Sequence, residues 1–210
     1  MKFIGFLIEG SWVTLQVFFL TLLFSLPLGL LVAFGRMSRI KLLNQFVKIY
    51  IDIMRGTPLI LQLIVVYFGP YYLFGLNIDR FLAAIVAFVI NYAAYFSEIY
   101  RGGIQSIPRG QYEAAEVLGF SKVQTFTRII LPQVIKRILP PISNEVITLV
   151  KDTALVQVLG VSELFRVAKN ESSRIASTTP LFIAGAFYFV MNWIVTKAFH
   201  IAERKLDYYR

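Results

Sequence analysis

The sequence predicts an all-α membrane protein with five transmembrane helices, and two observations lead to this fold class. Of the 210 residues, 57% are hydrophobic and only 16% are charged, and the mean hydropathy is +0.67. These values lie outside the range that is usual for a soluble domain. The second observation is a series of windows without charge along the chain. Since a helix of about 20 residues crosses the roughly 30 Å hydrocarbon core, each window is a candidate span.

The predicted spans follow these windows in chain order. Four windows have the length of a span or come close to it, whereas Ile138–Val150 needs polar residues at its ends to cross. No repeat or change of composition divides the chain, so residues 1–210 are expected to form one domain. We place the five spans at residues 10–35, 56–78, 81–97, 134–151 and 175–196.

The basic residues predict how these spans are oriented. Segments 36–55 and 98–137 and the tail from Lys197 hold 15 of the 21 Lys and Arg residues. Because loops rich in Lys and Arg stay in the cytoplasm, we expect the N-terminus outside and the C-terminus inside. The same loops account for the net charge of +9, so no nucleic-acid partner is expected.

Between the first two spans, the sequence predicts an amphipathic helix at the membrane surface. Apolar residues from Leu43 to Met54 recur at helical spacing and leave polar residues on the opposite side. Thr57 then suits the N-cap of the second span, and Pro58 suits its first helical position.

Residues 101–132 predict a helical hairpin on the cytoplasmic side. Pro108 suits the start of its first helix, and Gly119 suits a left-handed cap at the end of that helix. Ser121 suits the N-cap of a second helix that runs toward Pro132. An amphipathic loop helix on lipid headgroups would give the same local signals, so the helix pattern alone leaves both interpretations open.

The amino-acid sequence of the hairpin resembles a motif of a known family. Glu-Ala-Ala at 113–115 is followed after three residues by Gly119, and after nine more by Ile129, Leu131 and Pro132. This order resembles the EAA loop of the membrane subunits of binding-protein-dependent ABC importers.

Two further stretches resemble the polar amino acid branch of that family. They are "RGTPLILQLIVVYF" from Arg55 and "KDTALVQVLGVSEL" from Lys151. The resemblance covers essentially the whole chain. Ala154 departs from the pattern, since relatives often carry Ser there, and this puts a role for that position in doubt.

The resemblance implies a type I ABC importer transmembrane domain with cytoplasmic coupling helices, in a prokaryotic plasma membrane. The implied partners are two copies of an ATP-binding cassette subunit, a second permease subunit and an extracytoplasmic amino acid-binding protein. For the second subunit, a homodimer is favoured over a heterodimer. ATP and Mg²⁺ are expected on the partner ATPase, because this chain has no GxxxxGK[ST] phosphate loop. The resemblance gives an ATPase-coupling role to Glu113, Ala114, Ala115, Glu116, Leu118 and Gly119.

Polar residues in the fourth span suggest a substrate path. Asn144, Thr148, Lys151 and Asp152 fall at i, i+4, i+7 and i+8, and so share one face of a helix. An ionised side chain at the bilayer centre costs at least about 2.5–3.5 kcal/mol, so this face should meet a partner or a wet cavity. The candidate substrate-binding residues are Lys151, Asp152, Glu163, Asn144, Glu145, Thr148, Thr57 and Asn91.

The charges in this set suit a zwitterion. Lys151 would attract an α-carboxylate and Asp152 an ammonium or guanidinium group, with a slight preference for a cationic amino acid. Three alternatives stay open: Asn91 and Gln62 as interhelical hydrogen bonds, Lys151 and Asp152 as a neutralised pair, and Glu163 as a rim residue.

The leading hypothesis is therefore a permease subunit for an amino acid of the arginine, lysine, histidine or glutamine class. A secondary active amino acid transporter is the alternative, although inverted repeats would be expected in one. An enzyme is less favoured, because the chain has no Cys and its single His, His200, lies in the tail. For the same reason neither a catalytic residue nor a metal ligand is expected.

Overall fold

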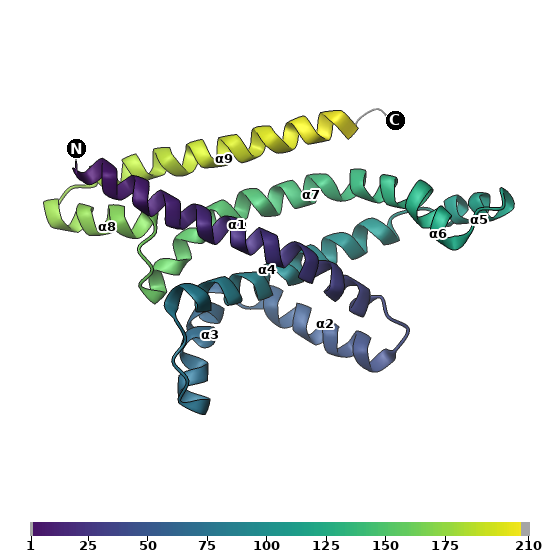
Figure 1. Cartoon of the computed structure of the whole chain (residues 1–210), viewed down its shortest axis with the longest axis horizontal. Helices are drawn as coiled ribbons and strands as arrows, with labels where there is room; N and C mark the ends of the chain where they lie inside the picture. Colours follow the sequence, from purple (N-terminus) through teal and green to yellow (C-terminus); the bar gives the residue numbers. More distant parts are fainter. Residues whose placement is uncertain (1, 207–210) are drawn as a thin grey trace.

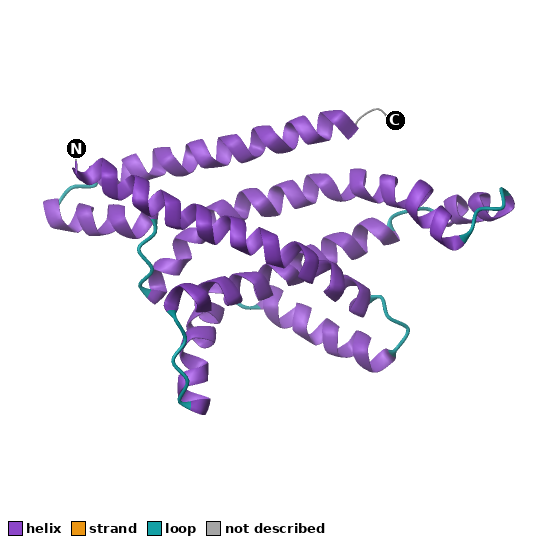
Figure 2. Ribbon diagram, viewed as in Figure 1, coloured by secondary structure: helices purple, strands orange, loops and turns teal. Residues whose placement is uncertain are grey.

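The structure is a computed structural model that describes residues 2–206, and these residues form helices and connecting loops only (Figure 2). A π-helical turn, η1, and a 3₁₀ helix, η2, interrupt the series of α-helices. In chain order the elements are α1 (Lys2–Arg36), α2 (Lys41–Gly56), α3 (Leu59–Phe74), α4 (Arg80–Gln105), α5 (Arg109–Val117), α6 (Lys122–Gln124), η1 (Thr125–Ile130), α7 (Leu131–Asp152), η2 (Thr153–Leu159), α8 (Leu164–Ile175) and α9 (Thr179–Leu206).

Most of the helices run along the long direction of the molecule (Figure 1). In the described part of the chain, three helices, α1, α4 and α9, are long and apolar enough to cross a membrane. α2 and α3 form a fourth candidate span if they count as one broken helix, because their axes bend by 113° at the junction. α7 has the length of a span, at 22 residues, but it carries the polar stripe.

α4 lies at the centre of the bundle because small residues let its neighbours approach closely. Its buried alanines and its aromatic residues Phe88, Tyr92 and Phe96 form the main core with α1 and α7. On α1, a Cβ at Gly29 would lie 2.9 Å from the Cβ of Phe96. Close backbone contact of this kind is the usual way that membrane helices associate.

The hairpin is confirmed in its first half and differs in its second. Gly119 has a left-handed backbone (φ +77°) just beyond α5, and Ser121 forms a capping box with Gln124. The second helix, however, does not stop near Pro132, because α6, η1 and α7 are continuous in sequence. Pro132 has no N–H for a helical bond, and the π-helical turn directly before it accommodates this loss.

Both positions predicted for the start of the second span, Thr57 as N-cap and Pro58 as first helical residue, are wrong by one residue. Thr57 ends α2 instead of capping α3, since its hydroxyl donates back to the carbonyl oxygen of Ile53 (2.7 Å), and Pro58 is the N-cap of α3. Glu163 is the N-cap of α8. The amphipathic helix predicted around 43–54 is confirmed as α2.

The hairpin and α8 lie at opposite ends of the molecule (Figure 1). α8 packs beside the first turns of α1, where a Cβ on Gly10 would lie 3.0 Å from the backbone of Leu164. At the other end, Ile107, Ile130 and Val134 form a small core that joins the hairpin to α7. Long helices therefore connect the end that holds α8 to the end that holds the hairpin.

Candidate functional site

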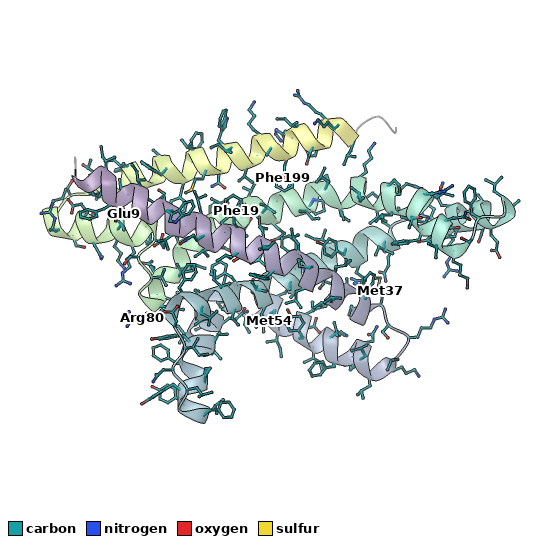
Figure 3. The ribbon with its side chains drawn as sticks, in the orientation of Figure 1. Glu9, Phe19, Met37, Met54, Arg80 and Phe199 are labelled. Atoms are coloured by element: carbon teal, nitrogen blue, oxygen red, sulfur yellow. The ribbon has the colours of Figure 1, made fainter. Side chains whose placement is uncertain are left out.

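A polar cluster lies at the bend between α2 and α3, beside Met54 (Figure 3). Gln62 donates through Nε2 to the carbonyl oxygen of Met54 (3.0 Å) and to Oγ1 of Thr57 (2.8 Å). Asn91 of α4 donates through Nδ2 to the same Met54 oxygen (3.1 Å) and to Oε1 of Gln62 (2.9 Å). Backbone groups freed at a helix break need such partners inside a membrane. Thr57 and Asn91 thus hold the bend against the middle of α4.

Asp152 is linked to α4 through Tyr92, the residue that follows Asn91. The hydroxyl of Tyr92 donates to Oδ2 of Asp152 at 2.8 Å, and Tyr92 itself is buried. No described group donates to Oδ1 of Asp152. Lys151 is exposed, and within residues 2–206 it forms no ion pair with Asp152 or with another acid. Asp152 therefore has one carboxylate oxygen that accepts no hydrogen bond from the described residues.

The polar stripe of α7 faces away from the chain's own core. Asn144, Thr148 and Lys151 are exposed, whereas Val146, Leu149 and Val150 on the other side of the helix are buried. Glu145 is half-buried and accepts no hydrogen bond from the described residues. An exposed polar face does not suit lipid, so it suits a water-filled path or a partner subunit.

Three charged side chains, Arg55, Glu98 and Arg101, form a cluster on the side of this region that faces the hairpin. Arg101 donates to both oxygens of Glu98, at 2.9 and 2.6 Å, and Nη1 of Arg55 lies 3.9 Å from the same carboxylate. The Arg55 guanidinium also lies 5.4 Å from the centre of the Tyr95 ring. Arg55 is the last charged residue before the bend, so it connects the bend to this charged cluster.

Glu163 belongs to a different environment. Its side chain is fully buried (0% exposed) and accepts hydrogen bonds from the backbone N–H groups of Phe165 (2.6 Å) and Arg166 (2.7 Å). The Tyr188 hydroxyl donates to the same carboxylate at 2.9 Å. The structure thus uses Glu163 as a helix cap and does not group it with the exposed stripe of α7.

Sequence reasoning missed two residues of the region, Tyr92 and Arg55. Tyr92 follows Asn91, but an aromatic residue in an apolar helix predicts a core position, and it is also a core residue here. Arg55 appeared only as a cation before the second span and as the first residue of a quoted stretch, without a role at the site. Nothing in the local pattern indicates that Tyr92 reaches Asp152, because the two residues are 60 positions apart.

Comparison with known proteins identifies the family of this chain. The family described as "Binding-protein-dependent transport system inner membrane component" matches residues 25–208.

The chain belongs to this family.

As a family member, it is an inner membrane transport subunit and not an enzyme. Among curated relatives, the arginine transport system permease protein ArtQ of Bacillus subtilis is 40% identical over 97% of this chain and 93% of its own length. The putative glutamine transport system permease protein GlnP of Rickettsia conorii is 36% identical, over 97% and 94% of the two chains.

A solved structure supports the same fold. The "crystal structure of an amino acid ABC transporter with histidines" contains a chain that is 38% identical to this permease, with a TM-score of 0.89. The match covers 97% of this chain and 95% of that one. The permease therefore has the type I ABC importer fold, and its family implies an ATPase partner, a binding protein and a dimer.

The hairpin of the permease ends in an exposed apolar surface. Val117 is 89% exposed and Leu118 is 73% exposed, at the tip next to Gly119. Glu113, Ala114 and Glu116 of α5 are also exposed, whereas Ala115 is buried. Gln133 of α7 donates to Oε1 of Gln111 at 3.2 Å, and Arg137 donates to Ser106, so both ends of the hairpin are tied to the long helices.

Proposed function

We propose that this permease carries a polar amino acid, with a preference for a cationic one, into the cell. The observation that carries the proposal is the carboxylate of Asp152, which is held by Tyr92 and keeps one oxygen open beside the exposed stripe of α7. The names of the relatives, which specify arginine and glutamine, support the same class of substrate. Asp152 would bind the ammonium or guanidinium group, because an opposite charge and a hydrogen bond together favour a cation.

The other members of the site take supporting roles. Lys151 would attract the α-carboxylate, and Asn144, Glu145 and Thr148 would line the path. Thr57 and Asn91 would shape it through the bend. We leave Glu163 out of the substrate contacts because its carboxylate is buried as a cap.

A thermal-shift screen tests the substrate class. The purified assembly of permease and ATPase is heated with each of the twenty amino acids at a concentration far above the dissociation constant. We expect arginine, lysine, histidine or glutamine to raise the melting temperature most, by about 5 °C, because a ligand at 100 times its dissociation constant adds about 2.7 kcal/mol. The largest shift with aspartate or glutamate would contradict the role of Asp152.

The topology is part of the proposal. We propose five spans, with residues 56–78 around α3 as the second span, after the surface helix α2, and α7 as the fourth. The N-terminus would lie outside and the hairpin in the cytoplasm. The basic residues next to the hairpin support this orientation. The exposed polar stripe supports a second permease subunit across the path, and an identical copy is the simplest choice. ATP and Mg²⁺ would be bound by two copies of the ATPase subunit, and Glu113 to Gly119 would contact that subunit.

Cysteine labelling tests the orientation without background, because the chain has no Cys. Val117→Cys places a thiol at the tip of the hairpin, and Ser173→Cys places one on the exposed side of α8. We expect a membrane-impermeant maleimide to label Ser173→Cys in intact cells and Val117→Cys only after the membrane is opened. Labelling of Val117→Cys from outside would overturn the orientation.

A further inference from the structure

Two arginine side chains converge on one point at the end of the bundle that holds α8. Gly160, which ends η2, has a left-handed backbone (φ +85°). A Cβ at Gly160 would lie 2.7 Å from Nη1 of Arg80 and 2.9 Å from Nη1 of Arg166. The two nitrogens can therefore be no farther apart than the sum of these distances. The missing side chain of Gly160 leaves the space in which both guanidinium groups lie.

This arrangement brings two permanent positive charges close together, that of the exposed Arg80 and that of the half-buried Arg166. In the part of the chain that the structure describes, neither guanidinium forms an ion pair. Nη1 of Arg166 is buried and has no hydrogen-bond partner. A buried donor without a partner is costly, and a charged one more so. An anion placed between the two guanidinium groups would remove both the unmet hydrogen bond and the repulsion.

The nearby acidic side chains interact with other groups of the chain. Oδ1 of Asp79 accepts from the backbone N–H of Leu82 (3.0 Å) at the start of α4. Both oxygens of Glu163 accept from the backbone at the start of α8. Glu171 forms its ion pair with Arg174 (2.6 Å), whose hydrogen bond lowers the pKa of that carboxyl. Among the described residues, no acidic side chain thus forms an ion pair with Arg80 or Arg166.

The pair is too far from Asp152 to belong to the same bound amino acid. Gly160 lies eight residues beyond Asp152, mostly along a 3₁₀ helix that rises about 2 Å per residue, which gives a separation on the order of 15 Å. Arg80 lies twelve residues before Tyr92 in α4, about 18 Å at 1.5 Å per residue. Figure 3 shows Arg80 near the end of the molecule that holds α8.

We propose that Arg80 and Arg166 form a carboxylate-binding site at the outer end of the permease, which rests on the orientation proposed above. The planar guanidinium group matches a carboxylate with two parallel hydrogen bonds, and two such groups would hold one carboxylate from both sides. Two carboxylates reach this end during import. One is an acidic side chain of the binding protein that docks here, and the other is the α-carboxylate of the amino acid that it releases.

The test uses the complete assembly in lipid nanodiscs, with Arg80→Gln and Arg166→Gln as the variants. Arg174→Gln is the matched control, because it removes a cation from the same end that already has its partner in Glu171. The first arm measures the affinity of the substrate-free binding protein for the nanodiscs. The second arm measures the binding of radiolabelled arginine to the assembly without binding protein, and arginine is replaced by the best ligand of the thermal-shift screen if that differs.

We expect both variants to weaken binding at least about tenfold in one arm, as for other charge-assisted hydrogen bonds, and the control to change it less than twofold. A loss in the first arm assigns the site to a carboxylate of the binding protein, and a loss in the second arm assigns it to the substrate. Arg80→Lys should recover part of the loss, since it keeps the charge without the fork of donors. Unchanged binding in both arms, with a wild-type assembly that imports the amino acid, overturns the proposed site. A wild-type assembly that imports no amino acid would instead refute the proposed function.

Discussion

Gly119→Val is expected to reduce amino acid uptake at least tenfold while the permease still inserts into the membrane. Gly119 has φ +77°, which a β-branched side chain adopts only with strain on the order of 1–3 kcal/mol. The strain would fall on the turn between α5 and α6, which positions the exposed tip at Val117 and Leu118. A displaced tip would no longer meet the ATPase, so ATP hydrolysis should continue without transport.

Gly110→Val is the control for this experiment. Gly110 also lies in the hairpin, but its φ is not in the left-handed region and an added Cβ would meet no atom within 4 Å. Uptake and ATP hydrolysis are measured in the same proteoliposomes. Glu113→Lys, which reverses an exposed charge of α5, should uncouple the two activities in the same way. Wild-type uptake by both Gly119→Val and Glu113→Lys would exclude the hairpin as the coupling element.

Asp152→Asn is expected to weaken substrate binding by about tenfold to a hundredfold. The change removes the negative charge but keeps the size of the side chain, and a hydrogen bond to a charged group contributes about 1.5–3 kcal/mol. Tyr92→Phe should have a smaller effect, because it removes only the hydroxyl that orients Oδ2. Calorimetric titration of the detergent-solubilised assembly measures both losses.

Asn77→Ala provides the comparison for Asp152→Asn. Asn77 lies in the exposed loop between α3 and α4, outside the stripe of α7 and the bend. Its removal should leave the affinity within twofold of the wild type. Equal affinities of the Asp152→Asn and Asn77→Ala assemblies would remove Asp152 from the substrate site.

The sequence was sufficient for features that depend on local chemistry. Apolar windows predicted the helical character of α1 and α9, and Gly119 and Ser121 predicted the turn of the hairpin. Each of these depends on residues within one or two helical turns. The prediction of Thr57 as a cap failed because neighbouring residues can each begin or end a helix, and packing decides between them.

The sequence was insufficient for features that depend on how the helices are oriented relative to one another. Hydropathy over 56–78 measures how apolar a segment is, and it contains no information on the 113° bend between α2 and α3. The bend is fixed by Asn91, which comes from another helix. Residue types predicted the polar face of α7, but its partner Tyr92 and the convergence of Arg80 and Arg166 required the tertiary structure.

The π-helical turn at Thr125–Ile130 sets the direction in which the side chains of α7 point relative to the hairpin. From Lys122 to Asp152 the backbone is helical without interruption for 31 residues, roughly 45 Å at 1.5 Å each, with the turn proposed to meet the ATPase at one end and the carboxylate proposed to bind substrate at the other. A π turn equals one residue inserted into an α-helix, and one residue corresponds to about 100° of rotation. A helix without that residue would keep its length almost unchanged but would turn the polar side of α7 by about 100° relative to the hairpin, so the proposed path depends on a count of residues as much as on their chemistry.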